Sequence, residues 1–514
     1  MLKYQYYYLA KLYDLCYNKT VGGDDLGSNN SKDLFKHLEE TLNKVDLLME
    51  ENKLFKIEIS TLKANHQKEI SILHSRVESL ESENKKLRDI INKDSSNSSK
   101  PPSSDGFKKI HNSREKTNKR VGGQKGHKGD TLKLFDKPTK VIEHKKELCE
   151  CGCHLVYSNE YKAKQQVDIE VITNITEHRA FTGVCPDCNS IVVNQLPKEL
   201  INTVTYGNNI KSFAAMLSSE GAVSINRTNQ IIKELTNGII NLSDATIVNF
   251  NKELSKKLEE TIIRIKEKLL ISPVNHKDET SVRINNSLHW FHVLSNKECT
   301  LYFTHAKRGN IADNDIDILP SYSGILVHDH LKGLYNFNCE HAECNAHILR
   351  YLKSAVENEK RAWAADMIKF FVDTNNIIKD LKANSVSCFS QIDIQTYFDR
   401  YDEILLNGHQ EFHLDPCKTK NYNGDDMKLL RRLKEYKTEH LRFITDFRVP
   451  FDNNLAERDL RMIKAKSKIS GCFRSEKGGE VFANIKSYTS TLRKNSKNIF
   501  QGISLAFSGD PVTI

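Results

Sequence analysis

Three acidic residues in the second half of the chain have types and surroundings suited to metal-dependent phosphoryl transfer. Asp278 lies in VNHKDETSVRI, Asp329 in GILVHDHLKGL and Glu457 in PFDNNLAERDLRMIK. The first two segments are typical of strands and the third of a helix. Carboxylates from separate elements can hold two divalent cations, and two cations can cut and rejoin a phosphodiester backbone. The sequence therefore favours these three residues as ligands of Mg²⁺ or Mn²⁺ in an enzyme that acts on nucleic acid.

Alternation along the two strands separates these acids from their neighbours. In the first strand Asp278 shares a face with His276, while Lys277 and Glu279 lie on the other face. In the second strand Asp329 follows two aliphatic residues of its own face, where a carboxylate is costly unless it is paired or bound to a metal. Asp278 taken alone is also compatible with a turn cap at the end of a strand.

Glu457 taken alone is compatible with an ordinary helix glutamate that pairs with Arg461 one turn later. Its surroundings favour an active-site helix, because Lys464 lies on the same helix face seven residues later. We expect Arg461 and Lys464 to contact phosphates, and the alternative is a basic, solvated helix face. Further basic residues follow in the same segment, namely Arg458, Lys466 and Lys468.

The composition limits the classes of protein to consider. The chain has 514 residues, which is too long for one hydrophobic core, so we expect several domains. Its net charge is +9 with 28% charged residues, which suits a polyanionic partner without requiring one. Its apolar runs are shorter than the ~18 residues of a membrane helix, and its first segment does not resemble a signal peptide. We expect a bacterial, cytoplasmic protein that acts at the nucleoid and has no membrane partner.

Residues 33–92 have the pattern of a long coiled-coil helix, and residues 1–32 are unassigned. A four-residue insertion after His66 interrupts the apolar seam, and Asn52 and Asn84 occupy positions where a buried asparagine favours a parallel dimer. We expect a homodimer or higher oligomer, and the alternative is a long helix packed on its own protein. The remaining seam residues are Val45, Leu48, Phe55, Ile59, Leu62, Ile70, Leu73, Val77, Leu80, Leu87 and Ile91.

A basic linker is predicted over residues 93–140, because serine, proline and glycine exclude a packed element there. Nine Lys and Arg residues lie between Lys100 and Lys128. We expect Lys125 and Lys128 to contact DNA phosphates, and the alternative is a merely solvated linker.

Five cysteines in residues 141–200 have the spacing of a small zinc ribbon. Cys149, Cys151 and Cys153 form a first knuckle, and Cys185 and Cys188 form a second, C-x-x-C knuckle. The segment QVDIEVITNITEHRAFTGV between them alternates as a β-hairpin would. Cys149, Cys151, Cys185 and Cys188 are the expected Zn²⁺ ligands, Cys153 can replace one of the first pair, and free thiols are the alternative. One further candidate ligand is His154.

Residues 205–271 are predicted to be helical, either as a helix-turn-helix DNA reader or as a packing domain, with Ser243 as an N-cap.

Residues 272–505 change to strand periodicity. Three strands, with a turn at Asn285-Asn286, precede a helix near Asp313 to Leu319, a buried strand at GILVHDH and a further candidate strand at NCEHAEC. This order resembles the ribonuclease H-like core. A helical insertion is expected at about 345–445, and 506–514 is a tail.

Several long motifs resemble the IS66-type insertion-sequence transposases. The matching segments are SSKPPSSDGFKK, GGQKGHKGDTLK, the cysteine cluster, HKDETSVR, LVHDHLKG, HAECNAHILRYL, PFDNNLAERDLRMIKAKSKISGCFRS and SYTSTLRKNSKNIF. The resemblance implies a DDE enzyme with Asp278, Asp329 and Glu457 as its metal-binding triad. It also matches Cys344 and His347 to a C-x-x-H motif of the family, for which we expect a structural role near the catalytic core.

The chain departs from the family pattern at Ser281, where glycine is expected, and at Glu343, where an apolar residue is expected. The first 30 residues match nothing in the pattern. None of these departures affects the triad.

The expected protein is therefore a multidomain α+β transposase that uses Mg²⁺ (or Mn²⁺) and Zn²⁺. Its expected partners are the terminal inverted repeats of an insertion sequence and a target DNA. Two alternatives remain: a dimeric zinc-containing DNA-binding regulator without catalysis, and a ribonuclease H-like nuclease or resolvase that cuts without joining.

Overall fold

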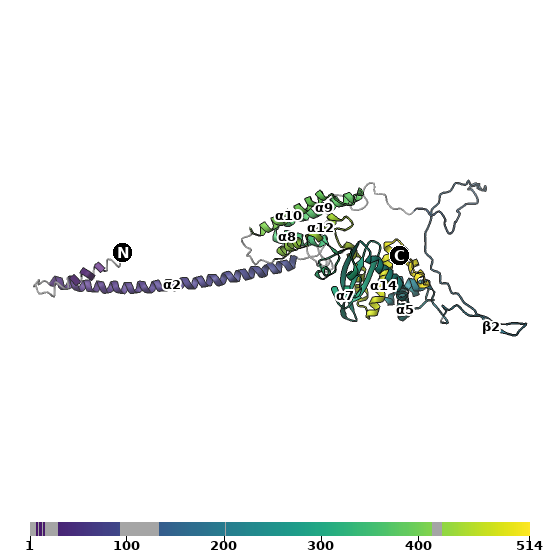
Figure 1. The fold of residues 1–514 in the computed structure, drawn as a ribbon, viewed down its shortest axis with the longest axis horizontal. Helices are drawn as coiled ribbons and strands as arrows, with labels where there is room; N and C mark the ends of the chain where they lie inside the picture. Colours follow the sequence, from purple (N-terminus) through teal and green to yellow (C-terminus); the bar gives the residue numbers. More distant parts are fainter. Residues whose placement is uncertain are drawn as a thin grey trace. The chain divides into compact units, whose positions relative to one another are not determined.

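A computed structural model of the chain describes residues 7–8, 10–12, 14–15, 29–92, 133–200, 202–413 and 424–513. These residues belong to two compact units, Met1–Asn92 and Lys93–Ile514. The presence of both helices and sheets confirms the predicted α+β class (Figure 1). Among the described helices, none is both long and apolar enough to cross a membrane.

The first unit contains one long helix. Helix α2 spans Asn29–Asn92, which agrees with the helix predicted over 33–92 (Figure 1). Its 64 residues make it about 96 Å long at a rise of ~1.5 Å per residue. The seam residues Phe55, Leu62 and Leu80 are each more than half exposed. The helix therefore presents an apolar stripe that its own turns do not cover.

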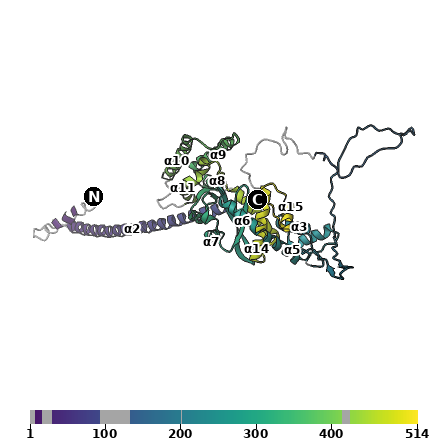
Figure 2. The same cartoon turned by 45° about the vertical axis from the view of Figure 1, so that its right-hand side comes forward.

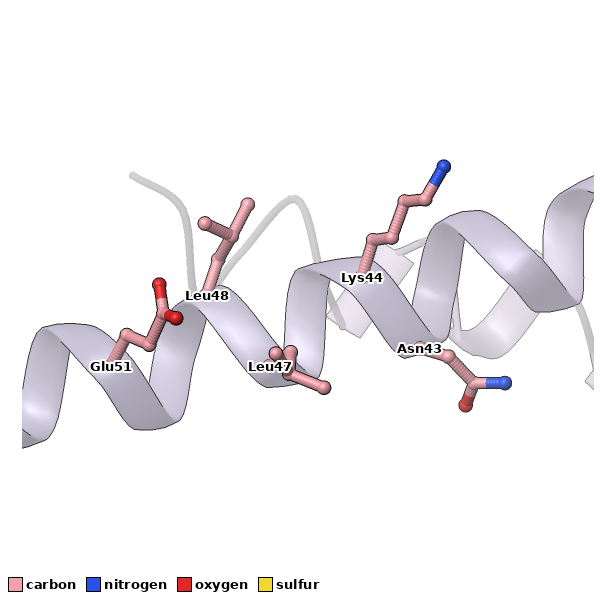
Figure 3. A pocket seen from close by; sticks show the side chains of 5 residues that line it. All are labelled: Asn43, Lys44, Leu47, Leu48 and Glu51. Carbon is pink, nitrogen blue, oxygen red and sulfur yellow. The ribbon is translucent and has the colours of Figure 1, made fainter.

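A shallow pocket lies on the surface of α2. Figure 3 shows its lining side chains, which all come from this one helix and point in different directions. Because these side chains do not converge on a common point, we assign no binding site to it. The lining residues are Asn43, Lys44, Leu47, Leu48 and Glu51.

The cysteine region differs from the predicted hairpin. Strands β1, Thr182–Val184, and β2, Ile191–Val193, pair antiparallel and enclose the second cysteine knuckle. Residues 166–181, where strands were predicted between the two knuckles, form no strand, so this prediction is wrong. The physical reason is that the apolar side chains of this segment, such as Ile169 and Ile175, are exposed, so a strand here would have no apolar surface to pack against.

Five strands of the second unit form one mixed sheet in the order β5-β4-β3-β6-β7. Strands β3, β4 and β5 are antiparallel neighbours, while β6 and β7 run parallel to β3. Asn285 and Asn286 form the predicted turn with φ of 48° and 63°, which asparagine tolerates. All five predicted strands are confirmed, with bounds β3 Val274–Ile284, β4 Ser287–Ser295, β5 Thr300–His305, β6 Ile325–His328 and β7 Glu340–Glu343.

The connection from β5 to β6 contains a short helix, α7 (Asn310–Asp315), and a 3-10 turn, η2 (Leu319–Ser321). The helix predicted from Asp313 to Leu319 therefore begins and ends earlier than expected. Asp317 explains the early end, because its φ of 56° is left-handed and interrupts a right-handed helix. A second 3-10 turn, η3 (Lys332–Asn336), connects β6 to β7.

A group of four helices lies on one side of the sheet, and α6 of this group packs on β5. Ile265 of this layer shares a hydrophobic cluster with Leu294 and Leu326 of the sheet. The Ser243 side chain accepts a hydrogen bond from the Thr246 N–H, which confirms Ser243 as an N-cap. The layer consists of α3 Asn208–Ser219, α4 Ile225–Leu235, α5 Asp244–Lys257 and α6 Glu259–Leu270.

The opposite face of the sheet packs against a group of helices at the position of the predicted insertion. Because side chains alternate along β6, Val327 joins a cluster with Trp363 and Phe371, while Leu326 belongs to the cluster on the other face. The insertion helices α8, α9 and α10 lie close to one another in both Figure 1 and Figure 2. The group consists of α8 Asn345–Glu359, α9 Ala362–Ala383, α10 Gln391–His413, α11 Asp425–Glu435 and α12 Lys437–Thr445.

Three final helices return to the sheet, namely α13 Asn454–Ser470, α14 Glu476–Lys494 and α15 Ile499–Ser508. Helix α14 lies along β5, where the Tyr302 N–H donates to Ser487 Oγ at 2.8 Å. Helix α15 packs on α3. Because α15 continues to Ser508 and Phe507 is buried, the folded core extends past the boundary predicted at residue 505.

Candidate active site

Two of the predicted acids lie side by side where the ladder between strands β3 and β6 ends. The parallel ladder between β3 and β6 ends where Lys277 pairs with His328. Asp278 and Asp329 are therefore the next residues of each strand and belong to the same face of the sheet. Helix α13 packs on β3 and carries Glu457 in its first turn.

The charges of the three acids affect one another. The pKa of Asp278 is raised to about 7, first by burial and then by the negative charges of Asp329 and Glu457. The Glu279 N–H opposes this rise, because it donates to Asp278 Oδ1 at 2.7 Å and favours the ionised form. The structure thus brings together three residues that are separated by 51 and 128 positions in the sequence.

Two residues of the C-x-x-H motif join this group. Ligand atoms of Asp329, Cys344, His347 and Glu457 all lie within 4.8 Å of one another, and among the described residues this is the one such group found. Cys344 is the N-cap residue of α8, and His347 lies in the first turn of that helix. The sequence predicted only a structural role near the catalytic core for these two residues.

Three buried polar atoms in this group lack a hydrogen-bond partner within the described residues: Asp329 Oδ1, His347 Nδ1 and Glu457 Oε1. His347 Nδ1 lies 3.2 Å from Asp329 Oδ1, but the two atoms lack hydrogen-bond geometry. Buried polar atoms are normally satisfied, so three unpaired donor atoms at one place indicate space for a cation.

Asn453 connects the elements that carry the acids. Its Nδ2 donates to the Lys277 carbonyl at 2.8 Å, and its Oδ1 lies 2.9 Å from His276 Nδ1. Its backbone N–H donates to Cys344 Sγ at 3.2 Å, and its carbonyl accepts from the Glu457 N–H at 3.2 Å. This fully buried side chain therefore fixes the start of α13 against β3. Asn453 is the N-cap residue of α13, but its side chain makes no capping hydrogen bond to that helix.

The opposite face of β3 holds a buried polar cluster. Lys277 Nζ lies 3.1 Å from Asp313 Oδ1 and 3.0 Å from His292 Nδ1. Glu279 also approaches His292, at 3.3 Å. Lys277 and Glu279 thus share a face that excludes Asp278, as the alternation predicted. Burial and the positive charge of Lys277 lower the pKa of His292 to about 2, so this imidazole is neutral.

Glu343, which stands where the family pattern has an apolar residue, is buried and fully paired. Its Oε1 accepts from Tyr335 Oη at 2.5 Å and lies 2.5 Å from His330 Nδ1, and its Oε2 accepts from Arg432 at 2.7 Å. Burial alone would raise its pKa, but these partners lower the pKa far below the ordinary value. Because Arg432 belongs to α11, its ion pair with Glu343 of β7 connects the helical insertion to the sheet.

The basic residues of α13 divide into two groups. Arg461 and Lys464 are exposed and free to meet a ligand. Lys466 instead is buried, and its Nζ donates to the carbonyls of Ser218 and Val223 at 3.1 Å each. Lys466 is therefore not part of an exposed basic face, because helical periodicity turns this position toward the core.

The remaining predicted ligands are not part of this site. Lys125 and Lys128 lie outside the described residues. The five cysteines of the ribbon region are free thiols in the structure, and none belongs to the metal-ligand group described above. Hydrogen bonds from Ser190 lower the pKa of Cys188 to about 7, which favours the thiolate that metals bind.

Comparisons with known proteins agree with the sequence motifs. A family model described as "Transposase IS66 family" matches residues 203–481, which is more than half of the chain and includes the whole carboxylate site. A second model, "Family of unknown function (DUF6444)", matches residues 43–133. No curated protein matches the chain. With its site and its match over residues 203–481, the chain belongs to the IS66 family of transposases.

Proposed function

We propose that this transposase is a DDE enzyme that cleaves DNA at the ends of an insertion sequence and joins those ends to a target. Asp278, Asp329 and Glu457 are its catalytic carboxylates. The observation that carries the proposal is the proximity of the three acids: Asp278 and Asp329 directly follow the last pair of the β3–β6 ladder, and ligand atoms of Asp329 and Glu457 lie within 4.8 Å of each other. Three carboxylates at one place are a poor arrangement for stability alone, and a cation would compensate for their repulsion.

The sheet supports a ribonuclease H-like core. Three antiparallel strands followed by two parallel strands, in the order β5-β4-β3-β6-β7, agree with the arrangement that the sequence led us to expect. In this arrangement Asp278 lies on the central strand β3 and Asp329 follows its parallel neighbour β6. The two carboxylates are thus held by a rigid sheet, while Glu457 is added from a helix.

The donor atoms fit divalent cations. Asp278, Asp329 and Glu457 supply carboxylate oxygens, the donors that Mg²⁺ and Mn²⁺ prefer, and Asp329 Oδ1 and Glu457 Oε1 are buried without a hydrogen-bond partner. Asp278, Asp329 and Glu457 would together hold these ions. Bound there, the ions would activate a water or a DNA 3′-hydroxyl and stabilise the leaving oxygen.

The chain's own residues would position the DNA. Arg461 and Lys464 extend from the same helix as Glu457 and are exposed, so their cationic side chains can contact backbone phosphates next to the reacting bond. Because its pKa is raised to about 7, the Asp278 carboxyl is protonated in a fraction of the molecules near neutral pH, and a bound cation would favour its ionised form. Asn453 would position Glu457 relative to β3, because its side chain donates a hydrogen bond to the Lys277 carbonyl of that strand.

Other parts of the chain would recognise and pair the element ends. We propose that Cys185 and Cys188 with two of Cys149, Cys151 and Cys153 bind Zn²⁺, and that this ribbon, the basic linker and the exposed side of α3–α6 contact the terminal inverted repeats. The coiled coil of α2 would pair two protomers, so that both ends are held in one complex.

A joining assay with labelled element ends tests the proposal. Asp278→Asn, Asp329→Asn and Glu457→Gln should each abolish Mg²⁺-dependent cleavage and strand transfer, while DNA binding remains. Asp317→Asn is a matched control, because this exposed acid adopts a left-handed conformation that asparagine also tolerates. Wild-type strand transfer by any triad variant would refute the assignment. Cleaved but unjoined product from the wild-type protein would indicate a nuclease or resolvase instead.

A further inference from the structure

The group at Asp329 contains donors that a Mg²⁺ site does not need. Its four ligand atoms are the thiol sulfur of Cys344, a ring nitrogen of His347 and carboxylate oxygens of Asp329 and Glu457, all within 4.8 Å of one another. Mg²⁺ prefers oxygen ligands and keeps several waters, whereas sulfur and imidazole ligands favour zinc and other transition metals. Asp278 is not a member of this group.

The sulfur atom is held as a metal ligand would be. Cys344 is fully buried at the junction of β7 and α8, and its Sγ accepts a hydrogen bond from the Asn453 N–H at 3.2 Å. Hydrogen bonds from outer partners orient ligand atoms and tune the metal. The Asn453 N–H thus holds the Cys344 sulfur in place at the start of α8.

The other three ligand atoms lie close together, with His347 Nδ1 3.2 Å from Asp329 Oδ1. Asp329 Oδ1, His347 Nδ1 and Glu457 Oε1 are buried and have no hydrogen-bond partner within the described residues. Tetrahedral ligands at bond lengths of ~2.0–2.3 Å lie ~3.3–3.8 Å apart. The observed limit of 4.8 Å therefore requires only small side-chain movements to close around one ion.

We propose that Asp329, Cys344, His347 and Glu457 form a four-ligand site for a zinc-class cation, distinct from the three-carboxylate arrangement. On binding, the Cys344 thiol and the His347 imidazolium each give up one proton to solvent, so that a thiolate sulfur and a neutral ring nitrogen meet the ion. Zn²⁺ in this position occupies two of the proposed catalytic carboxylates and so competes with Mg²⁺. Only this last consequence depends on the proposed function.

Cobalt binding to the full-length protein tests the site, because Co²⁺ occupies zinc sites and shows a thiolate charge-transfer absorption in the near ultraviolet. The five ribbon cysteines are first changed to serine, which removes their own contribution. We expect one Co²⁺ per chain with the thiolate absorption, displaced by Zn²⁺ and retained in excess Mg²⁺. Cys344→Ser should remove the absorption, and Cys388→Ser, at an exposed cysteine, should keep it.

His347→Gln provides a second variant in case Cys344→Ser fails to fold, and circular dichroism verifies the fold of each. The His347→Gln substitution should weaken Co²⁺ binding at least ~10-fold, because the loss of even a residue that only hydrogen-bonds to a metal ligand has an effect of this size. Asp278→Asn should keep the absorption whether or not the protein joins DNA, which separates this proposal from the transposase mechanism. A folded protein without thiolate absorption, or an absorption unchanged by Cys344→Ser, would overturn the proposal.

Discussion

Asn453 shows how a single uncharged side chain can organise an acidic site. It connects the backbone of β3, the imidazole of His276 and the sulfur of Cys344 to the first turn of α13. A buried amide that satisfies several partners is costly to remove, because each partner then remains unpaired in the interior. The position of Glu457 relative to Asp278 thus depends on a residue that touches neither carboxylate.

We therefore predict that Asn453→Ala lowers the free energy of unfolding by about 1–3 kcal/mol and reduces strand transfer. Asn454→Ala is the matched control, since this neighbouring asparagine is only half-buried and its side chain takes no part in the network among the described residues. Chemical denaturation and the joining assay measure both effects. An Asn453→Ala protein with unchanged strand transfer would remove the proposed positioning role.

A second residue-scale prediction concerns His440, which is fully buried beside Asn345. Burial lowers the pKa of His440 to about 3, against ~6.5 in an unfolded chain. Between these values the unfolded state binds a proton that the folded state does not. The free energy of unfolding should therefore fall with decreasing pH, by about 1.4 kcal/mol per pH unit from this residue.

Urea denaturation between pH 7 and pH 3, which spans the interval between the two pKa values of His440, would test this effect. His440→Gln should be less stable near neutral pH but lose less stability on acidification. His178→Gln, at an exposed imidazole, should follow the wild type. Parallel curves for His440→Gln and wild type would contradict the prediction.

Residue patterns predicted part of the site. Alternation separated Asp278 from Lys277 and Glu279, because a strand has a fixed period of two. Asp329 was predicted from two aliphatic neighbours on its own face. The roles of Asn453 and Glu343 could not be predicted, because they depend on partners more than 80 positions away in the sequence.

At the scale of elements, a buried ionic network joins the helical layer to α14. Lys486 Nζ lies 2.6 Å from Glu220 Oε1, and Arg493 and Thr489 also bind Glu220. Burial would raise the pKa of Glu220, but Lys486 outweighs it and lowers the pKa. The network connects the end of α3 to the helix that lies along β5.

We predict that Lys486→Met destabilises the fold by about 3 kcal/mol, because it leaves Glu220 buried with fewer positive partners. The double variant Glu220→Gln/Lys486→Met should recover part of this loss. Lys477→Met, which removes an exposed pair at 3.0 Å on the same helix, should change stability by less than about 0.5 kcal/mol. Thermal and urea unfolding would measure these differences, and equal effects of Lys486→Met and Lys477→Met would contradict the account.

Element predictions succeeded where burial and periodicity agreed. Hydrophobic clusters cover the strands β3 to β7. The apolar residues that recur along these strands in the sequence are therefore the ones that pack in the core. The segment 166–181 has similar alternation but no covering layer, and it forms no strand. The alternation of apolar and polar residues within a segment does not show whether another apolar surface packs against that segment.

At the scale of the whole molecule, α2 offers a long apolar seam for a second copy of the chain. We predict that Ile59→Glu/Leu62→Glu, which places charges on this seam, converts a dimer into monomers. Leu54→Glu/Ile57→Glu is the matched control, because it replaces two exposed apolar residues of the same helix outside the seam. Sedimentation equilibrium gives the molecular mass of each. A monomeric wild type, or an equal response of both variants, would refute self-association through this seam.

The contact between α3 and α15 has a consequence for biosynthesis. Asn208 Nδ2 donates to Ser508 Oγ at 2.9 Å, and residues from both helices belong to one hydrophobic cluster. A nascent polypeptide that still has α15 inside the ribosomal exit tunnel cannot complete this cluster, although the sheet has long since emerged. We therefore expect the ability of the chain to act on DNA to appear only after α15 has left the exit tunnel.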